Sequence, residues 1–244
     1  MINEILPGEA AAAEAFHDPP DVRLFPEEQD AVADAVDKRR REFATARACA
    51  RDALAQLGFP PAPVPRRGGG APRWPDGVTG SITHCAGYRA CAVARTPDVA
   101  SIGIDAEPNE ATPPGVLATI SDRAERAQIA RLSAEEPAVA WDRLLFSAKE
   151  SVYKTWYPLT GRWLGFDGAS ISFNPTHRTF SARLLEVSLM INGNELKTIH
   201  GHWMTQGGLL ITAISIHATK VKQDADQITR DRELITCHVC RNIG

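Results

Sequence analysis

Two stretches decide the fold: Ile102-Gly103-Ile104-Asp105-Ala106-Glu107-Pro108 and Phe146-Ser147-Ala148-Lys149-Glu150-Ser151-Val152-Tyr153-Lys154. The first predicts a strand that ends at a proline. Because side chains along a strand alternate between faces, Asp105 and Glu107 should share one side and the isoleucines the other. Two neighbouring carboxylates repel each other. A hard cation between them is the cheaper arrangement, with Gly103 leaving room beside it.

The second stretch predicts the end of a helix that begins near Glu136. On a helical wheel its apolar residues form one narrow stripe of Trp141, Leu145, Ala148, Val152 and Trp156. The stripe leaves Glu150 and Lys154 together on the opposite side, so a third acid stands one turn from an ammonium. Two plainer interpretations stay open. Asp105 and Glu107 would form a solvated strand end, and Glu150 with Lys154 would form a surface pair worth about 0.2–0.5 kcal/mol.

In combination, the two stretches resemble the signature of the 4′-phosphopantetheinyl transferases. That signature is Gly-(Ile/Val)-Asp-x-Glu, followed by (Trp/Phe)-(Ser/Cys)-x-Lys-Glu-(Ser/Ala)-x-x-Lys, and it matches at residues 103–107 and 146–154. The resemblance runs from about Pro26 to Ala218. The chain is long enough for two half-domains, so it resembles the monomeric surfactin-type (type II) branch.

The resemblance implies an α+β fold. Two similar half-domains would be related by a pseudo-twofold axis, each a small, mainly antiparallel sheet packed with helices, with the active site at their interface. We expect an N-terminal arm at 1–20, half-domains at 21–107 and 108–218, and a polar tail at 219–244 that is too poor in large apolar residues to fold. The alanine-rich, acidic arm should be loosely held.

Composition bounds the class of protein. The 244 residues can form one domain or two small ones, and 23% charged with 43% hydrophobic residues is ordinary for a soluble globular chain. A net charge of −3 gives no general affinity for nucleic acid. The N-terminus lacks a positively charged leader, and no segment approaches the roughly 18 apolar residues of a membrane span. We therefore expect a cytoplasmic protein without nucleic-acid or membrane partners.

The five cysteines are too few, and odd in number, for a disulfide framework. Cys49, Cys85 and Cys91 should act as small core residues. Only Cys237-His238-Val239-Cys240 resembles a metal motif, and a zinc site there would need two further ligands. The alternative is an unstructured tail.

Arginines line the first predicted helix, Glu27 to Leu57, which Gly58 closes. Its inner stripe would contain Val32, Val36, Phe43, Ala50 and Leu54. Arg39 and Arg47 fall within or beside that stripe, where a guanidinium must find an anion or reach back to water. In the resembled family, basic residues at these two places contact the 3′-phosphate and diphosphate end of coenzyme A.

Two further segments resemble family elements that bind coenzyme A. Residues 60–77 are rich in proline and glycine and predict a connection or a lid, in which Arg66 and Arg67 stand where relatives carry a lysine. Gly70-Ala71-Pro72 resembles the element that lies against the nucleotide. The run from Ser81 to Cys85 matches another family segment, which implies that Thr83 and His84 contact the cofactor, His84 through a phosphate.

The remaining pattern predicts short strands and one capped helix. The helix opens at Ser121, with Asp122 and Glu125 in its first turn. A hairpin turn is predicted at Asn192-Gly193. The strands are expected at 78–83, 90–95, 99–104, 169–173, 180–191, 195–204 and 209–216.

The resemblance also implies a reaction. The 4′-phosphopantetheine arm of coenzyme A would pass to a serine of an apo acyl or peptidyl carrier protein, with release of adenosine 3′,5′-bisphosphate. Mg²⁺ would be held by Asp105, Glu107 and Glu150, while the Ala106 side chain cannot ligate. Glu150 would also be the base, directly or through a metal-bound water. Lys154 would stabilise or protonate the departing phosphate, and Lys149 would contact phosphate.

Two rival functions use the same residues. A magnesium-dependent phosphohydrolase would attack with water and release phosphate without a protein acceptor. A non-catalytic coenzyme A binding scaffold would show erosion at Glu150 or Lys154, and neither residue is missing.

Overall fold

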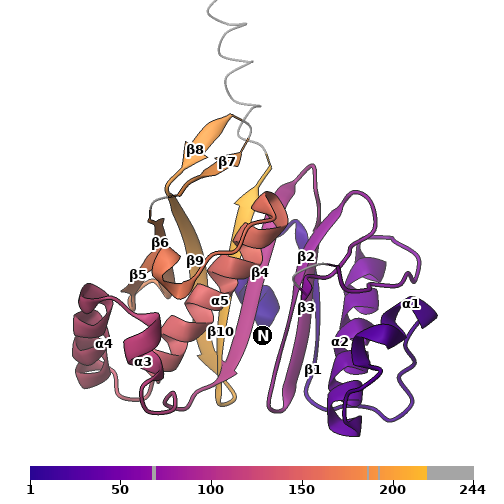
Figure 1. Ribbon diagram of the computed structural model, residues 1–244, viewed down its shortest axis with the longest axis horizontal. Coiled ribbons are helices and arrows are strands. Elements are labelled where there is room, and N and C mark those ends of the chain that lie inside the picture. The colour runs from indigo at the N-terminus through magenta and orange to yellow at the C-terminus, as the bar shows by residue number, and fades with distance from the viewer. Residues whose placement is uncertain (68–69, 186, 192, 219–244) are drawn as a thin grey trace, which may run out of the picture.

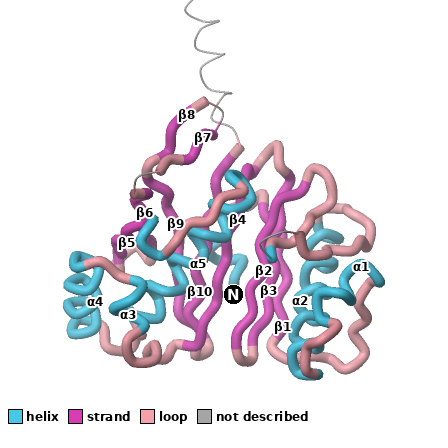
Figure 2. The backbone as a smooth tube through the Cα atoms, in the orientation of Figure 1, coloured by secondary structure: helices cyan, strands magenta, loops and turns pink. Residues whose placement is uncertain are grey.

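A computed structural model describes residues 1–67, 70–185, 187–191 and 193–218. Two antiparallel sheets stand side by side, and a long helix lies against each of them (Figures 1 and 2). The predicted α+β fold of two antiparallel units is confirmed. The predicted tail, with its Cys237–Cys240 motif, lies outside the described residues. None of the described helices has an apolar run that could traverse a bilayer.

The secondary structure follows the predicted order. The α-helices are α1 (Pro26–Gln29), α2 (Asp37–Gln56), α3 (Val116–Ile120), α4 (Arg123–Glu135) and α5 (Trp141–Thr160), and the 3-10 turns are η1 (Ile2–Ile5), η2 (Asp30–Val32) and η4 (Phe166–Gly168). The strands of the first half are β1 (Ala10–Ala15), β2 (Val78–Cys85), β3 (Tyr88–Arg95) and β4 (Val99–Pro108). Those of the second half are β5 (Ala169–Asn174), β6 (Thr179–Leu184), β7 (Leu189–Ile191), β8 (Asn194–Leu196), β9 (Thr198–Gln206) and β10 (Leu209–His217).

The N-terminal unit is a three-stranded sheet in the order β1-β3-β2, with helix α2 packed beside it against β1 and β3 (Figure 1). Alternation along β3 sends Cys91 and Val93 toward α2, where they meet buried Ala50 and Leu54. The other face of β3 is lined by alanines and packs on the second sheet. These small side chains let the two sheets approach closely.

Residues 2–5 and 10–15 form η1 and β1 and are packed against the N-terminal unit, so the prediction of a loosely held arm is wrong for them. Strand β1 pairs with β3, and Ile2 of η1 is fully buried. Glu14 of β1 accepts hydrogen bonds from the Met1 ammonium at 2.7 Å and from the Tyr88 hydroxyl at 2.6 Å. An alanine run carries little periodic contrast, and for that reason the strand is hard to distinguish from a tail in the sequence.

The predicted helix from Glu27 to Leu57 is also corrected, because it divides into α1, η2 and α2. Val36 is the extended N-cap of α2 and is 74% exposed, so it is not part of the inner stripe. The break is supported by buried Glu28, whose carboxylate accepts from the Val64 amide at 2.8 Å and pairs with Arg51 at 3.3 Å. The other stripe residues, Val32, Phe43, Ala50 and Leu54, are buried as predicted.

The C-terminal unit is a five-stranded sheet in the order β4-β10-β9-β6-β5, packed against α5. The predicted apolar stripe of α5 is confirmed, because all five of its residues are at most 1% exposed. Helix α5 begins at Trp141, not near Glu136. Strand β4 pairs with β10, so by sheet membership the units divide between β3 and β4, one strand before the predicted boundary at 107/108.

Two of the long predicted strands are interrupted. The stretch 180–191 divides into β6 and β7, and 195–204 divides into β8 and β9. Strands β7 and β8 pair with Leu189 opposite Leu196, which confirms the predicted hairpin, although Asn192 itself is not described. The hairpin extends from the top of the C-terminal unit in Figure 1.

The edge strands β2 and β4 join the two units. Ser81 Oγ accepts from the Ile104 amide at 3.1 Å, and Thr83 Oγ1 accepts from the Ala106 amide at 3.0 Å. Since Ile104 and Ala106 lie on either side of Asp105, this joint fixes the backbone of the predicted ligand.

Candidate active site

Asp105 lies at the centre of the site and is only 5% exposed. Its Oδ1 accepts from Lys154 Nζ of α5 at 2.7 Å and from Thr83 Oγ1 of β2 at 3.2 Å. Its Oδ2 is buried and has no hydrogen-bond partner among the residues that the structure describes. Burying a carboxylate oxygen without a hydrogen-bond donor costs free energy of folding. This oxygen is therefore a candidate to accept a bond from a ligand or a cation.

The two glutamates lie close enough to feel the charge of Asp105. Burial and then Asp105 raise the pKa of Glu107, while Arg143, whose Nη1 lies 3.1 Å from Glu107 Oε2, opposes the rise. Burial also raises the pKa of Glu150; there Lys154 opposes the shift and Asp105 adds to it. The structure therefore gathers the three predicted acids in one electrostatic neighbourhood.

Gly103 brings α5 against β4, which corrects the idea that it leaves room for a cation. A Cβ atom at this position would lie 2.2 Å from both the Ser151 carbonyl oxygen and Thr155 Oγ1. Only glycine permits this approach. The close packing places Glu150 and Lys154 next to Asp105.

Lys154 stands where prediction placed it, and Lys149 does not. Lys154 Nζ donates to the Ile104 carbonyl at 3.1 Å as well as to Asp105, so within the described residues one of its three protons has no acceptor. Lys149 Nζ is buried and donates to Glu125 at 3.0 Å, to the Phe166 carbonyl at 2.6 Å and to the Ala169 carbonyl at 2.9 Å. All of its protons are used, so the predicted phosphate contact of Lys149 is corrected to a structural role.

Thr83 also differs from its prediction. Its side chain is 1% exposed, and its hydroxyl donates to Asp105 and accepts from the Ala106 amide. A group enclosed in this way supports Asp105 and is not available to coenzyme A.

A basic cluster, Arg39, Arg47, Arg66 and His84, lies on the N-terminal unit. Arg39 Nη1 hydrogen-bonds His84 Nε2, which acts as the acceptor. Partial burial and Arg39 lower the pKa of Arg66, and Arg66 in turn acts against the charge on Arg47. The mutual influence shows that these side chains share one region.

Arg47 is the most unusual member of the basic cluster. It is 4% exposed, its guanidinium stacks 4.1 Å above the Phe43 ring, and its Nε has no hydrogen-bond partner in the described part of the chain. Burial lowers the pKa of Arg47 to about 10, against an opposing influence from Glu28. A buried cation without a paired anion is a prepared anion site.

His84 connects the basic cluster to the acids. Desolvation of the crowded ring, followed by the charges of Arg39 and Lys154, lowers the pKa of His84 to about 4 although the residue is exposed. The imidazole is therefore neutral at pH 7. Arg67 is exposed beside residues 68–69, and no contact links its side chain to the cluster within the described part of the chain.

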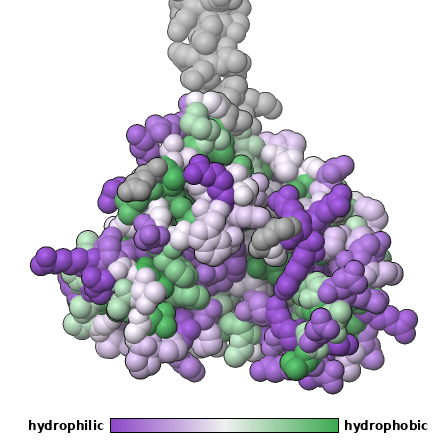
Figure 3. Space-filling view, in the orientation of Figure 1, coloured by the Kyte–Doolittle hydropathy of each residue, from purple (hydrophilic) through white to green (hydrophobic). Residues whose placement is uncertain are grey.

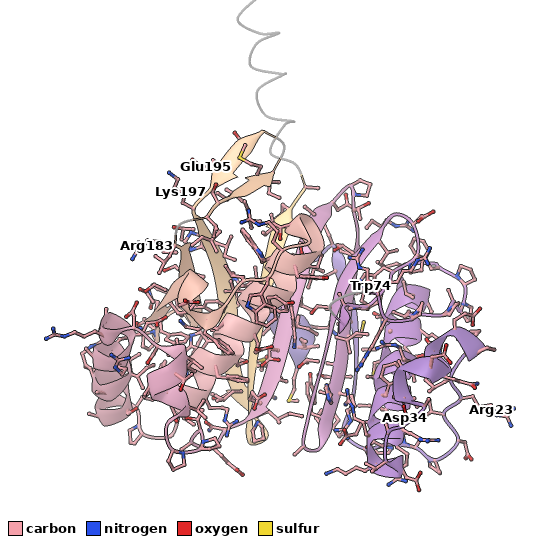
Figure 4. The ribbon with its side chains drawn as sticks, in the orientation of Figure 1. Arg23, Asp34, Trp74, Arg183, Glu195 and Lys197 are labelled. Carbon is pink, nitrogen blue, oxygen red and sulfur yellow. The ribbon has the colours of Figure 1, made fainter. Side chains whose placement is uncertain are left out.

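Two cavities meet at Glu150 and Tyr153. One, of about 210 Å³, lies between the units and is lined by Trp74, Ser81 and Lys154 together with residues 70–72. The other, of about 160 Å³, lies beneath Trp163 and Phe166. Figure 4 shows Trp74 on the N-terminal unit, and hydrophilic side chains gather in the middle of the same face in Figure 3. A flexible substrate has room on both sides of Glu150.

Comparisons of the sequence with known proteins identify the family. The model of the 4′-phosphopantetheinyl transferase N-terminal domain matches residues 27–94, and that of the 4′-phosphopantetheinyl transferase superfamily matches residues 101–204. The chain is 53% identical over 221 residues to the 4′-phosphopantetheinyl transferase Svp of Streptomyces mobaraensis, covering 89% of this chain and 90% of the relative. The chain belongs to the 4′-phosphopantetheinyl transferase family.

Two further relatives share nearly their whole length with it. The 4′-phosphopantetheinyl transferase PptT of Mycobacterium tuberculosis is 46% identical over 88% of this chain and 97% of its own, and Npt of Nocardia iowensis is 45% identical over 88% and 99%. The predicted transferase class is confirmed. Coenzyme A and carrier proteins are the substrates on which this family acts.

The acids of this transferase fit a hard divalent ion. Among the residues that the structure describes, no three His, Cys, Asp or Glu side chains are grouped so that they could hold a metal ion; Asp105 pairs with Lys154, and Glu107 pairs with Arg143. The donor set is nevertheless all oxygen, and within that part of the chain Asp105 Oδ2 is buried without a partner and no hydrogen bond to the Glu150 carboxylate is seen. An oxygen set of this kind suits Mg²⁺.

Two residues of the transferase were missed by sequence reasoning. Arg143 precedes Glu150 by two helical turns, so the spacing alone places it on the α5 face that meets β4. Glu125 was recognised only as a capping acid; it caps α4 as predicted, and it also receives Lys149 and the Ile171 amide. No pattern in the neighbouring sequence predicts these contacts, because they join residues that lie far apart in the chain.

Proposed function

We propose that this transferase moves the 4′-phosphopantetheine arm of coenzyme A to a serine of an apo acyl or peptidyl carrier protein in a Mg²⁺-dependent reaction. The product left behind is adenosine 3′,5′-bisphosphate. One observation carries the proposal. Three arginines, Arg47, Arg66 and Arg39, gather on the N-terminal unit, the neutral His84 ring accepts a hydrogen bond from Arg39, and Lys154 lies beyond it beside the acids.

These positive groups match the charges of the substrate. Coenzyme A carries a 3′-phosphate and a diphosphate, and the guanidinium fork is well shaped for both. Arg47 gains the anion that it lacks in the free protein. Arg39 and His84 would turn from each other toward phosphate oxygens, with Arg66 and Arg67 at the open edge.

Asp105, Glu107 and Glu150 would hold Mg²⁺. When bound, the ion supplies positive charge to the diphosphate and to the leaving phosphate. Glu150 takes the proton from the attacking serine hydroxyl, and its raised pKa brings it closer to the working pH of a general base. Lys154, with one proton uncommitted, donates to the departing bisphosphate.

The finer assignments belong to the same proposal. We place the chain in the surfactin-type branch, as a cytoplasmic monomer without membrane or nucleic-acid partners. Its length accommodates both units, and the acids lie where those units meet within a single chain.

The test is the intact mass of an apo carrier protein after incubation with the full chain, coenzyme A and Mg²⁺. A gain of one phosphopantetheine is expected, and Asp105→Ala should abolish it while the variant stays folded. Phosphate release without a change in carrier mass would favour the phosphohydrolase. Binding of coenzyme A with neither product would favour the scaffold, and both outcomes contradict the proposal.

A further inference from the structure

Arg143, the third residue of α5, makes three directional contacts. Its Nη1 donates to Glu107 Oε2, its Nε to the Glu110 carbonyl and its Nη2 to the Ala111 carbonyl, each at 3.1 Å. The acceptors come from β4 and from the linker that follows it. A guanidinium held at three edges has one orientation, which a lysine cannot reproduce from a single ammonium.

The linker that supplies two of these acceptors is itself fixed to the start of α5. Asp142 accepts from the Thr112 amide at 2.8 Å and from its hydroxyl at 2.6 Å. Asn109 donates to the Ala138 carbonyl and accepts from the Ala140 amide, both at 2.8 Å. The segment that holds the Arg143 side chain is therefore itself fixed by hydrogen bonds to α5 and to the residues just before it.

We propose that Arg143 is a positioning residue for the divalent ion and acts through Glu107. It binds only Oε2 of the carboxylate, and no hydrogen bond to Oε1 is seen within the described residues. One oxygen is held by the guanidinium and the other is left for the ion. This inference rests on the proposed function, since it assumes that the acids bind a metal.

The direct test measures Mn²⁺ binding to the full chain by electron paramagnetic resonance, without coenzyme A or carrier. Arg143→Lys keeps the charge and removes the fork, so a change reports orientation and not net electrostatics. Partners that orient metal ligands typically contribute about 10–100-fold in metal affinity, and we expect a loss of about tenfold. Arg131→Lys alters the exposed pair with Glu135 on α4 and should bind Mn²⁺ like the parent.

Two further variants separate positioning from linker stability. Asp142→Asn weakens the linker without touching Glu107 and should retain Mn²⁺ affinity. In a Glu107→Gln background, Arg143→Lys should cause no additional loss, because the two residues act as one unit. An equal loss in Asp142→Asn, or an additive loss in the double variant, would show that Arg143 only stabilises the fold.

The outcomes also separate this inference from the proposed function. A parent chain that binds Mn²⁺ and loads a carrier, with an Arg143→Lys variant of parental Mn²⁺ affinity, overturns the role of Arg143 alone. A parent chain that binds no Mn²⁺ overturns the role of Arg143 and the magnesium requirement together. Carrier loading is then judged separately by intact mass.

Discussion

At the residue scale, the buried charge of Arg47 is an arrangement that costs the folded protein stability. Its desolvation is offset in part by the Phe43 ring and by the distant charge of Glu28, but no anion among the described residues touches it. A stacked cation contributes about 0.5–2 kcal/mol, less than the several kcal/mol that burial of an ion typically costs. In the free protein the buried Arg47 charge therefore lowers the stability of the fold, and a bound phosphate would compensate that charge.

Arg47→Leu should accordingly separate stability from binding. We expect a melting temperature equal to or above that of the parent in the absence of coenzyme A. The KM for coenzyme A should rise about tenfold or more, as for the loss of a charged hydrogen bond. Arg41→Leu, on the exposed side of the same helix, is the control and should leave the KM unchanged. A parental KM in Arg47→Leu would assign Arg47 to structure alone.

His84 should make coenzyme A binding depend on pH. The pKa of His84 is about 4 in the free protein, and a phosphate beside the ring would raise it. Between the free and bound values, the complex takes up a proton, so affinity increases as pH falls. Metal-free titrations at about pH 7.5 and about pH 5.5 should show a larger gain in the parent than in His84→Gln. Equal gains would remove His84 from the phosphate site.

At the element scale, α5 is fixed on two sides, and each side sets the direction of the catalytic face. Gly103 lets the helix lie against β4, and Lys149 anchors it to α4 and β5 through Glu125 and the Ala169 carbonyl. The apolar stripe and the positions of Glu150 and Lys154 could be predicted from spacing. The Lys149 pairing could not, because it joins residues that lie far apart in the sequence.

Lys149→Met should therefore destabilise the fold without weakening substrate binding. It leaves Glu125 as an uncompensated buried charge, and breaking a buried pair in this way costs about 3–5 kcal/mol. Denaturant unfolding checks the stability, and coenzyme A titration well below the melting point checks the binding. A raised dissociation constant at parental stability would restore the phosphate contact originally predicted for Lys149.

Gly103→Ala tests the other side of α5. The added Cβ would meet backbone and hydroxyl oxygen at 2.2 Å, so α5 must move away from β4. Overpacking of this kind lowers the free energy of unfolding by about 1–3 kcal/mol. We also expect turnover to fall, because the displaced helix takes Lys154 away from Asp105. Gly8→Ala, where a Cβ meets no atom within 4 Å, is the matched control. Parental turnover would show that the helix position is not limiting.

At the scale of the whole molecule, the two units and their shared site followed from the signature, while the seam between them did not. Ser81 and Thr83 join β2 to β4 by side-chain hydrogen bonds to backbone amides, a contact without a sequence pattern. The N-terminal strand was missed because alanines carry no contrast between buried and exposed faces. The sequence identified charged residues at fixed spacing, such as Glu150 and Lys154. It did not identify the distant residues that pair with charged side chains, such as Arg143 with Glu107 and Glu125 with Lys149.

The acid cluster should couple the stability of the whole fold to protons and to metal. The pKa values of Glu107 and Glu150 are raised, so the folded state binds more protons than the unfolded chain, and these groups add stability as pH falls through their folded pKa values. Mg²⁺ would neutralise the negative charge of the buried carboxylates and would compete with protons for them. It should stabilise the chain by about 1–3 kcal/mol when present at about 10–100 times its dissociation constant. Thermal melts with and without Mg²⁺ should show a larger gain at about pH 8 than at about pH 5, and Asp105→Asn should lose the gain at both. A gain independent of pH would mean that the ion stabilises the chain at some other place.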